Sequence, residues 1–242
     1  MDKSGIKPGR LIYGGSFNPV HIGHLRLALE ACRLLGPFVR KVDFVPAACP
    51  PHKKSSGLLP FSMRAELVRL SIDGISCLEC NVIEEDLPEP SYSERTIRAI
   101  AAMRPDEELF FLLGSSDFAL LPEWRNGRDL PRLCNFAIAP RGDLDFAGFV
   151  AMAQQIWPGN VIVPQKQAAG LCACGPGMVS FVELSGGRKL FYLPVPFLDV
   201  SATYIRKLWL CGEDVDFLLP GQAIALLDRE RKAVEACWRG NY

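Results

Sequence analysis

Short runs of apolar residues recur along the chain, each bounded by glycine, proline or polar residues. These runs predict buried strands at residues 11–13, 42–45, 78–82, 109–113, 136–139 and 161–163. Between them, apolar residues three or four positions apart predict amphipathic helices near residues 62–72, 93–103 and 144–155. Because strands alternate with helices, we predict an α/β fold with a doubly wound, mostly parallel, Rossmann-like sheet.

The first strand leads into a glycine turn and then a helix. Pro19 begins this helix and Gly36-Pro37 ends it. Its apolar face consists of Ile22, Leu25, Leu29 and Cys32. Ligands of doubly wound sheets bind at the carboxyl ends of the strands. The loops after residues 13, 45 and 113 are therefore predicted to meet at a ligand site.

A chain of 242 residues suits one domain. We predict a single domain over residues 1–242, with a Rossmann-like core at residues 10–200 and a C-terminal helical segment at residues 201–242. Residues 165–187 are rich in glycine, alanine and cysteine and predict a surface excursion between strands. Within and after it, residues 179–184 and 189–193 predict a hairpin around Gly186-Gly187.

The composition is that of an ordinary globular protein. Hydrophobic residues make up 49%, charged residues 22%, and the formal net charge is zero, which disfavours a disordered chain or a strong nucleic-acid binder. Apolar runs such as residues 109–113 are far shorter than the roughly 20 residues of a membrane-spanning helix. Nine irregularly spaced cysteines favour reduced thiols. We expect a cytoplasmic protein without a membrane or nucleic-acid partner, in which local groups hold any anionic ligand.

Residues 14–24, Gly-Gly-Ser-Phe-Asn-Pro-Val-His-Ile-Gly-His, carry the clearest chemical signal. Two glycines let backbone amides approach a phosphate, and the following helix presents its N-terminal N–H groups to the same anion. His21 and His24 lie three apart, so both rings can face that anion. The third histidine of the chain, His52, lies in another predicted ligand loop. This distribution favours phosphate binding over a purely structural turn.

A second polar cluster lies near the other end of the chain. Ser201 is a natural N-cap for a helix whose first apolar positions are Ile205, Leu208 and Trp209. The hydroxyls of Ser201 and Thr203 can bind phosphate, and Arg206 supplies a permanent charge suited to a polyphosphate.

Together the two clusters resemble the nucleotidyltransferases with the H-x-G-H signature and, within them, the bacterial nicotinate mononucleotide adenylyltransferases. The resemblance runs in order over roughly residues 10–225. It includes Pro50-Pro51-His52-Lys53, Pro90-Ser91-Tyr92-Ser93 with Thr96, Gly114-Ser115-Ser116-Asp117, Pro122-Glu123-Trp124 and Leu218-Leu219-Pro220.

The resemblance implies a role for each matching position. The residues implied to line or hold phosphates are Gly14, Gly15, Ser16, Phe17, Ser201, Thr203 and, as catalytic residues, His21, His24, Lys53 and Arg206. Asp117 is implied to contact the nucleotide ribose. Trp124 is implied to stack on the pyridine ring, with Tyr92, Ser93 and Thr96 around the same pocket. Three departures stand out: Asn18 replaces a common Asp, which matters little if the side chain mainly caps the turn, Ser93 replaces a common Thr, and residues 165–187 form a longer stretch than the resemblance implies.

The implied reaction needs no protein nucleophile. The 5′-phosphate of nicotinate mononucleotide attacks the α-phosphorus of ATP in line, pyrophosphate leaves, and deamido-NAD forms in NAD biosynthesis. The resemblance implies Mg²⁺ carried with ATP and no protein metal ligands. We expect His24 to act as a charged imidazolium donor. Hydroxyls and amides at residues 92–96 and 124–126 predict a preference for the acid, although an inward-facing Glu94 would favour the amide.

Several alternatives remain at this stage. The chain could adenylylate nicotinamide mononucleotide or phosphopantetheine, or act as a silent nucleotide sensor on the same fold. It is short and neutral for a tRNA synthetase fragment. A structural zinc site could use the pairs Cys77-x-x-Cys80 and Cys172-x-Cys174, although these pairs lie far apart and the first overlaps a predicted strand. The oligomeric state is not predicted by any of these patterns.

Overall fold

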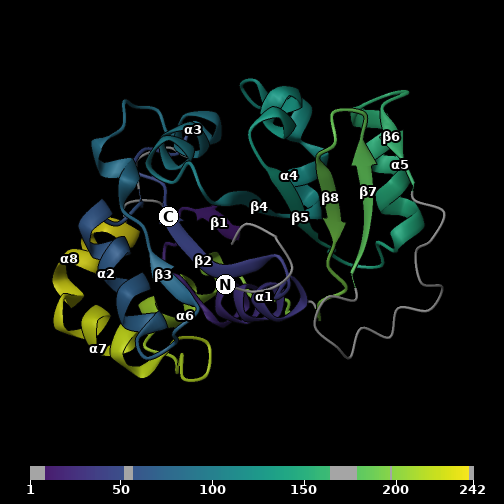
Figure 1. The fold of residues 1–242 in the computed structure, drawn as a ribbon. Helices are drawn as coiled ribbons and strands as arrows, with labels where there is room; N and C mark the ends of the chain where they lie inside the picture. Colours follow the sequence, from purple (N-terminus) through teal and green to yellow (C-terminus); the bar gives the residue numbers. More distant parts are fainter. Residues whose placement is uncertain (1–8, 52–56, 164–178, 197, 240–242) are drawn as a thin grey trace.

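The computed structural model describes residues 9–51, 57–163, 179–196 and 198–239. Within these ranges, eight strands form one sheet in the order β3-β2-β1-β4-β5-β8-β7-β6 (Figure 1). The strands are β1 (Gly9–Gly15), β2 (Val39–Pro46), β3 (Leu78–Cys80), β4 (Glu108–Gly114), β5 (Asn135–Ala139), β6 (Val161–Ile162), β7 (Ser180–Leu184) and β8 (Lys189–Tyr192). The first five and β8 are parallel, whereas β7 and β6 pair antiparallel at one edge.

Helices cover both faces of the sheet. The α-helices are α1 (Ile22–Leu34), α2 (Phe61–Ile72), α3 (Ser93–Met103), α4 (Ser115–Ala119), α5 (Phe146–Ile156), α6 (Ala202–Leu210), α7 (Gly221–Arg229) and α8 (Arg231–Arg239). Short 3₁₀ turns are η1 (Ile83–Asp86), η2 (Leu121–Glu123) and η3 (Gly127–Arg132). In the described ranges no helix is long and apolar enough to cross a bilayer.

Strand periodicity explains how one sheet supports two cores. Leu11 and Ile12 are adjacent on β1, and consecutive side chains of a strand point to opposite faces. Leu11 belongs to the core under α1, α2 and the C-terminal helices, and Ile12 belongs to the core under α3 and α5. Both side chains are almost fully buried.

The predicted parallel α/β sheet is confirmed, and the C-terminal segment is helical. The predicted hairpin is also confirmed: β7 and β8 pair antiparallel, and Gly187 adopts φ 81° in the turn. Three predictions were too simple. The first helix begins at Ile22, with His21 as its N-cap, and not at Pro19. The strand at residues 78–82 ends at Cys80, and residues 161–163 form a two-residue edge strand that is antiparallel to β7. The short helix α4 was not predicted, because five residues are too few to show helical periodicity.

Candidate active site

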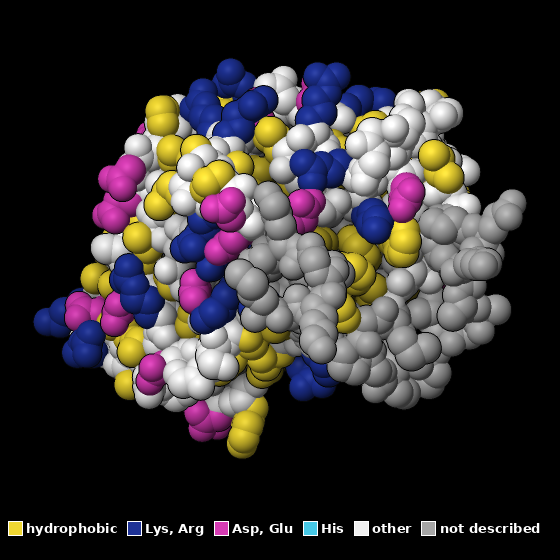
Figure 2. All heavy atoms as spheres, viewed as in Figure 1, with side chains coloured by type: hydrophobic (Ala, Val, Ile, Leu, Met, Phe, Trp, Pro, Cys, Tyr) yellow, Lys and Arg dark blue, Asp and Glu magenta, His cyan; other side chains and the backbone are white. Residues whose placement is uncertain are grey.

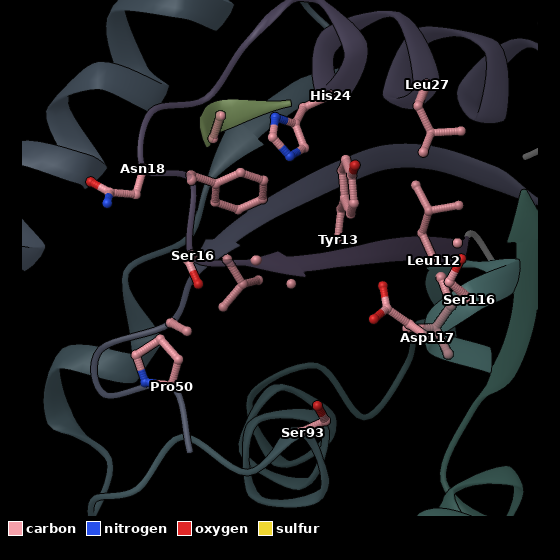
Figure 3. Close-up of a pocket in the computed structure, with 18 of the residues that line it drawn as sticks. Tyr13, Ser16, Asn18, His24, Leu27, Pro50, Ser93, Leu112, Ser116 and Asp117 are labelled. Atoms are coloured by element: carbon pink, nitrogen blue, oxygen red, sulfur yellow. The ribbon is translucent and has the colours of Figure 1, made fainter. Parts of the chain in front are cut away.

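A cleft of ≈ 1230 Å³ opens at the carboxyl ends of the central strands (Figure 3). The loops after β1, β2 and β4 meet there, as predicted, together with the N-terminus of α6. The sequence-predicted residues that line it are Gly14, Gly15, Ser16, Phe17, His21, His24, Tyr92, Ser93, Thr96, Asp117, Trp124, Ser201, Thr203 and Arg206. Lys53 lies outside the described residues, so its placement stays a prediction.

The turn after β1 is shaped around Phe17. This residue adopts φ 44°, is 2% exposed, and packs its ring against those of Tyr13, His24 and Phe44 at centroid distances of 5.6, 5.2 and 5.4 Å. A Cβ on Gly15 would lie 2.9 Å from the Phe17 ring, so the turn requires glycine there. The aromatic ring is an anchor, and any polar contribution of Phe17 to phosphate binding comes from its backbone.

Asn18 joins distant segments behind this turn. Its Nδ2 donates to the Gly57 carbonyl at 2.6 Å, and its Oδ1 accepts from the Leu59 amide at 3.1 Å and from Trp238 Nε1 at 3.4 Å. The interpretation of Asn18 as a turn cap is therefore wrong. Only an amide can both donate and accept in this way, and an ionised Asp could not donate to Gly57.

Arg64 was missed by the sequence reading and braces the same turn from α2. The side chain is 0% exposed and donates to the carbonyls of Leu59 at 2.8 Å, Ser16 at 2.8 Å and Ala48 at 3.3 Å. Burial lowers the pKa of Arg64 to about 10, so it remains a cation at neutral pH. One buried guanidinium thus holds three loop segments beneath the phosphate-binding turn.

The two signature histidines contact each other. Their ring centroids are 3.7 Å apart, and the His21 amide donates to His24 Nδ1 at 3.2 Å. An accepting Nδ1 carries no proton, so His24 is a neutral ring with its hydrogen on Nε2. A second proton would occupy the lone pair that receives the His21 amide, so an imidazolium requires this contact to break, and the predicted charged form beside bound phosphates stays a prediction.

His21 is also neutral. It is 5% exposed, and its Nδ1 is buried without a partner among the described residues. Burial and, secondarily, the charge of Arg141 lower the pKa of His21 to about 4. The pair therefore presents two uncharged rings to the cleft.

Arg206 links the two ends of the signature. Ser201 caps α6 as predicted, with its Oγ accepting from the Tyr204 amide at 3.2 Å. Arg206 Nη1 donates to the Asn18 carbonyl at 2.8 Å and Nη2 donates to Thr203 Oγ1 at 3.1 Å. These bonds hold the guanidinium at the turn after β1, which lies 188 residues away in the sequence.

The other end of the cleft is aromatic. The ring of Tyr92 lies against two guanidinium groups, those of Arg95 at 5.2 Å and Arg125 at 4.9 Å from its centroid. Trp124 packs edge-on against Phe111, with centroids 6.4 Å apart. Figure 3 shows Ser93 at the start of α3 with its hydroxyl directed toward the cleft.

Thr96 supports the pocket through Glu84, an acidic residue that the sequence did not indicate. It is 5% exposed and donates to buried Glu84, which also accepts from the Ala48 amide at 3.3 Å. Glu94, by contrast, does not line the cleft. Its carboxylate accepts from Asn126 Nδ2 at 2.6 Å and from Arg98 Nε at 2.9 Å, and the Asn126 bond is the main reason that its pKa is lowered.

Further cleft residues follow strands directly. Asp117 lies in α4 after β4, and Figure 3 shows its carboxylate directed toward Tyr13. Burial and then the charge of Asp117 raise the pKa of Tyr13, which stays protonated. Arg141 follows β5, and its backbone amide donates to Ser115 Oγ at 2.9 Å. Its place after a predicted strand was the one sequence signal that could have indicated it.

Within the described residues no three His, Cys, Asp or Glu side chains gather in a way that could hold a metal ion. Cys77 and Cys80 have free thiols, and Cys172 and Cys174 lie outside the described residues. The zinc alternative therefore has no described site.

Comparison with known proteins identifies the family. The cytidylyltransferase-like family model matches residues 12–208. The probable nicotinate-nucleotide adenylyltransferase of Pelobacter propionicus is 34% identical over 225 residues, covering 91% of this chain and 95% of the relative. That of Geobacter sulfurreducens is 32% identical over 220 residues, covering 91% and 95%. The nicotinic acid mononucleotide adenylyltransferase of Plasmodium falciparum, solved with NaAD, has the same fold, with a TM-score of 0.66 at 18% identity over 94% of this chain and 97% of that one. The chain therefore belongs to the cytidylyltransferase-like family and, within it, groups with the nicotinate-nucleotide adenylyltransferases.

Proposed function

We propose that the protein transfers the AMP part of ATP to the 5′-phosphate of nicotinate mononucleotide, giving deamido-NAD and pyrophosphate in NAD biosynthesis. One observation carries this assignment: a single cleft joins a phosphate-binding end to an aromatic end. The first contains the turn after β1, the two histidines and Arg206, and the second contains Tyr92 and Trp124. The names of relatives that match over nearly the whole chain support the same assignment.

The phosphate end suits ATP. The N-termini of α1 and α6 line the cleft, and helix dipoles favour anions there. Arg206 adds a permanent charge whose position is fixed by two hydrogen bonds. We propose that Ser201 and Thr203 hold the terminal phosphates beside it, and that Lys53 reaches the same region.

Chemistry in this site requires positioning and charge stabilisation only. A mononucleotide phosphate oxygen forms a bond to the α-phosphorus of ATP while the bond to the bridging oxygen of pyrophosphate breaks. Charge moves toward the leaving group, and His24 donates its Nε2–H to that charge as a neutral ring. His21, buried against it, fixes the orientation of the ring through its backbone amide. No covalent enzyme intermediate is needed.

Magnesium would arrive with ATP. Because no trio of acidic or metal-binding side chains gathers among the described residues, phosphate oxygens and water would hold the ion. It would neutralise polyphosphate charge. The free thiols of the described cysteines agree with a reducing compartment, and we propose that the protein works in the cytoplasm.

The aromatic end suits a pyridine ring. We propose that Trp124 stacks on it, and that Tyr92 and Ser93 contact the same nucleotide, whereas Thr96 acts through Glu84. A phosphopantetheine arm contains no ring that could stack on this surface. A silent sensor is disfavoured because His24 and Arg206 both occupy the cleft.

A pyrophosphate-release assay tests the proposal. ATP and Mg²⁺ are combined with nicotinate mononucleotide, nicotinamide mononucleotide or phosphopantetheine, and kcat/KM is measured for each. We expect the largest kcat/KM with nicotinate mononucleotide. Pyrophosphate release with none of the three would reject the proposed activity, and a larger value with phosphopantetheine would reject the substrate.

A further inference from the structure

We propose that Arg125 selects the acid form of the pyridine substrate by pairing its guanidinium with the nicotinate carboxylate. This inference rests on the proposed function. The acid and amide mononucleotides share the ribose and the phosphate, and they differ in one unit of charge on the pyridine substituent. A residue that separates them must act on that substituent.

Arg125 lies where such a residue is needed. It lines the cleft directly after Trp124, and its guanidinium is 4.9 Å from the centroid of the Tyr92 ring. Of the two aromatic residues proposed for the pyridine pocket, Trp124 precedes Arg125 in sequence and Tyr92 lies beside it in space. Figure 2 shows Lys and Arg side chains gathered at the top of the visible face, over α3, the helix that Tyr92 precedes.

The backbone on both sides of Arg125 is held. Trp124 packs on Phe111, and Asn126 adopts φ 54° while its Nδ2 donates to Glu94 at 2.6 Å. A Cβ on Gly127 would lie 1.8 Å from the Leu121 carbonyl oxygen, so the chain turns closely against η2 at that point. A segment held in this way loses less backbone conformational entropy when its side chain binds a ligand.

The charges along the cleft leave this role to Arg125. Three arginines line it among the described residues: Arg125, Arg141 and Arg206. Arg206 is bonded to the turn after β1, and Arg141 acts electrostatically on His21. Arg125 is the one beside Tyr92. Of the acids at the same end, Glu84 is occupied by Thr96 and the Ala48 amide, and Glu123 lines the cleft beside Trp124. Glu94 is held outside the cleft by Asn126 and Arg98, and these bonds, followed by the charges of Arg98 and Arg125, lower its pKa.

A matched pair of variants tests the proposal. Arg125→Gln removes the charge from the cleft. Arg95→Gln removes the other guanidinium that lies on Tyr92, but Arg95 does not line the cleft and donates to the Pro88 carbonyl at 3.0 Å. For each protein, kcat/KM is measured with nicotinate and with nicotinamide mononucleotide, and KM is measured for ATP. Arg125→Lys is included because it keeps the charge.

We expect Arg125→Gln to lower the acid-to-amide ratio of kcat/KM about tenfold, since a charge-assisted hydrogen bond contributes this much or more. KM for ATP should stay within about twofold of wild type, Arg95→Gln should keep the ratio, and Arg125→Lys should restore part of it. Equal losses with both mononucleotides would assign Arg125 to their shared phosphate and overturn the inference, as would an unchanged ratio. Wild-type protein that is inactive with both mononucleotides would instead reject the proposed function.

Discussion

Acidification should weaken the fold through His21. Burial holds the pKa of this residue near 4 in the folded protein, against an ordinary value of 6.5. Protonating His21 therefore costs about 3 kcal/mol more in the folded protein than in the unfolded chain. Between pH 6.5 and pH 4, His21 is mostly protonated in the unfolded chain and mostly neutral in the folded protein. The contribution of His21 to the free energy of unfolding is constant above pH 6.5 and decreases as the pH falls toward 4.

A His21→Asn variant isolates this effect, because all other groups titrate in both proteins. Urea unfolding is followed by fluorescence from pH 7.5 to pH 4, and the free energy of unfolding of the variant is subtracted from that of the wild type at each pH. As the pH falls to 4, we expect the free energy of unfolding of the wild type to decrease by up to about 3 kcal/mol relative to that of the variant. A difference that does not change with pH would refute the conclusion that His21 is buried as a neutral ring.

The same reasoning makes a kinetic prediction, because the pH dependence of kcat/KM reports groups of the free enzyme. With both histidines neutral, kcat/KM for ATP should change less than about twofold between pH 7 and 8.5. A required imidazolium of ordinary pKa would lower it more than about tenfold over that range.

Three substitutions extend these predictions to other parts of the cleft. His24→Ala should lower kcat about 100-fold or more in the pyrophosphate assay while far-ultraviolet circular dichroism is unchanged, because a donor to developing charge contributes about 3 kcal/mol; a near-normal kcat would remove the ring from the mechanism. Trp124→Ala should raise KM for the mononucleotide about tenfold and KM for ATP far less, since stacking acts on one substrate; equal increases would make Trp124 a packing residue. Asn18→Asp should lower the free energy of unfolding at pH 7 by about 1–3 kcal/mol, measured with urea, because a carboxylate cannot donate to Gly57; wild-type stability would contradict the hydrogen-bond assignment.

Hydrogen bonds connect the turn after β1 to the proposed pyridine pocket. The Ala48 carbonyl accepts from Arg64, which also holds Ser16, and the Ala48 amide donates to Glu84, which holds Thr96. Cys49 continues the link, because its amide donates to Ser91 Oγ at 2.8 Å. The segment after β2 therefore connects the turn after β1 to the residues around Ser91 and Thr96, and an in-line reaction depends on the relative position of groups bound at both places.

Features that depend on neighbouring residues could be predicted from the amino-acid sequence. Alternating apolar runs predicted the parallel sheet, glycine before an apolar helix predicted the turn after β1, and Ser201 predicted the cap of α6. In each case the deciding contact joins residues within one element or one turn, so the local pattern contains it. The rule that strand ends share one edge of the sheet then brought the two signature segments into one cleft.

The partners of individual side chains could not be predicted in the same way, because they come from distant parts of the chain. Asn18 reaches Trp238 across 220 residues, and Arg64 reaches Ser16 across 48. Glu94 faces Asn126 and not the cleft, and His24 Nδ1 accepts from the His21 amide. These outcomes depend on which polar atoms burial leaves within about 3 Å of each other, and strand register and helix packing set those distances. A residue's identity states what it can donate or accept, and the fold supplies the partner.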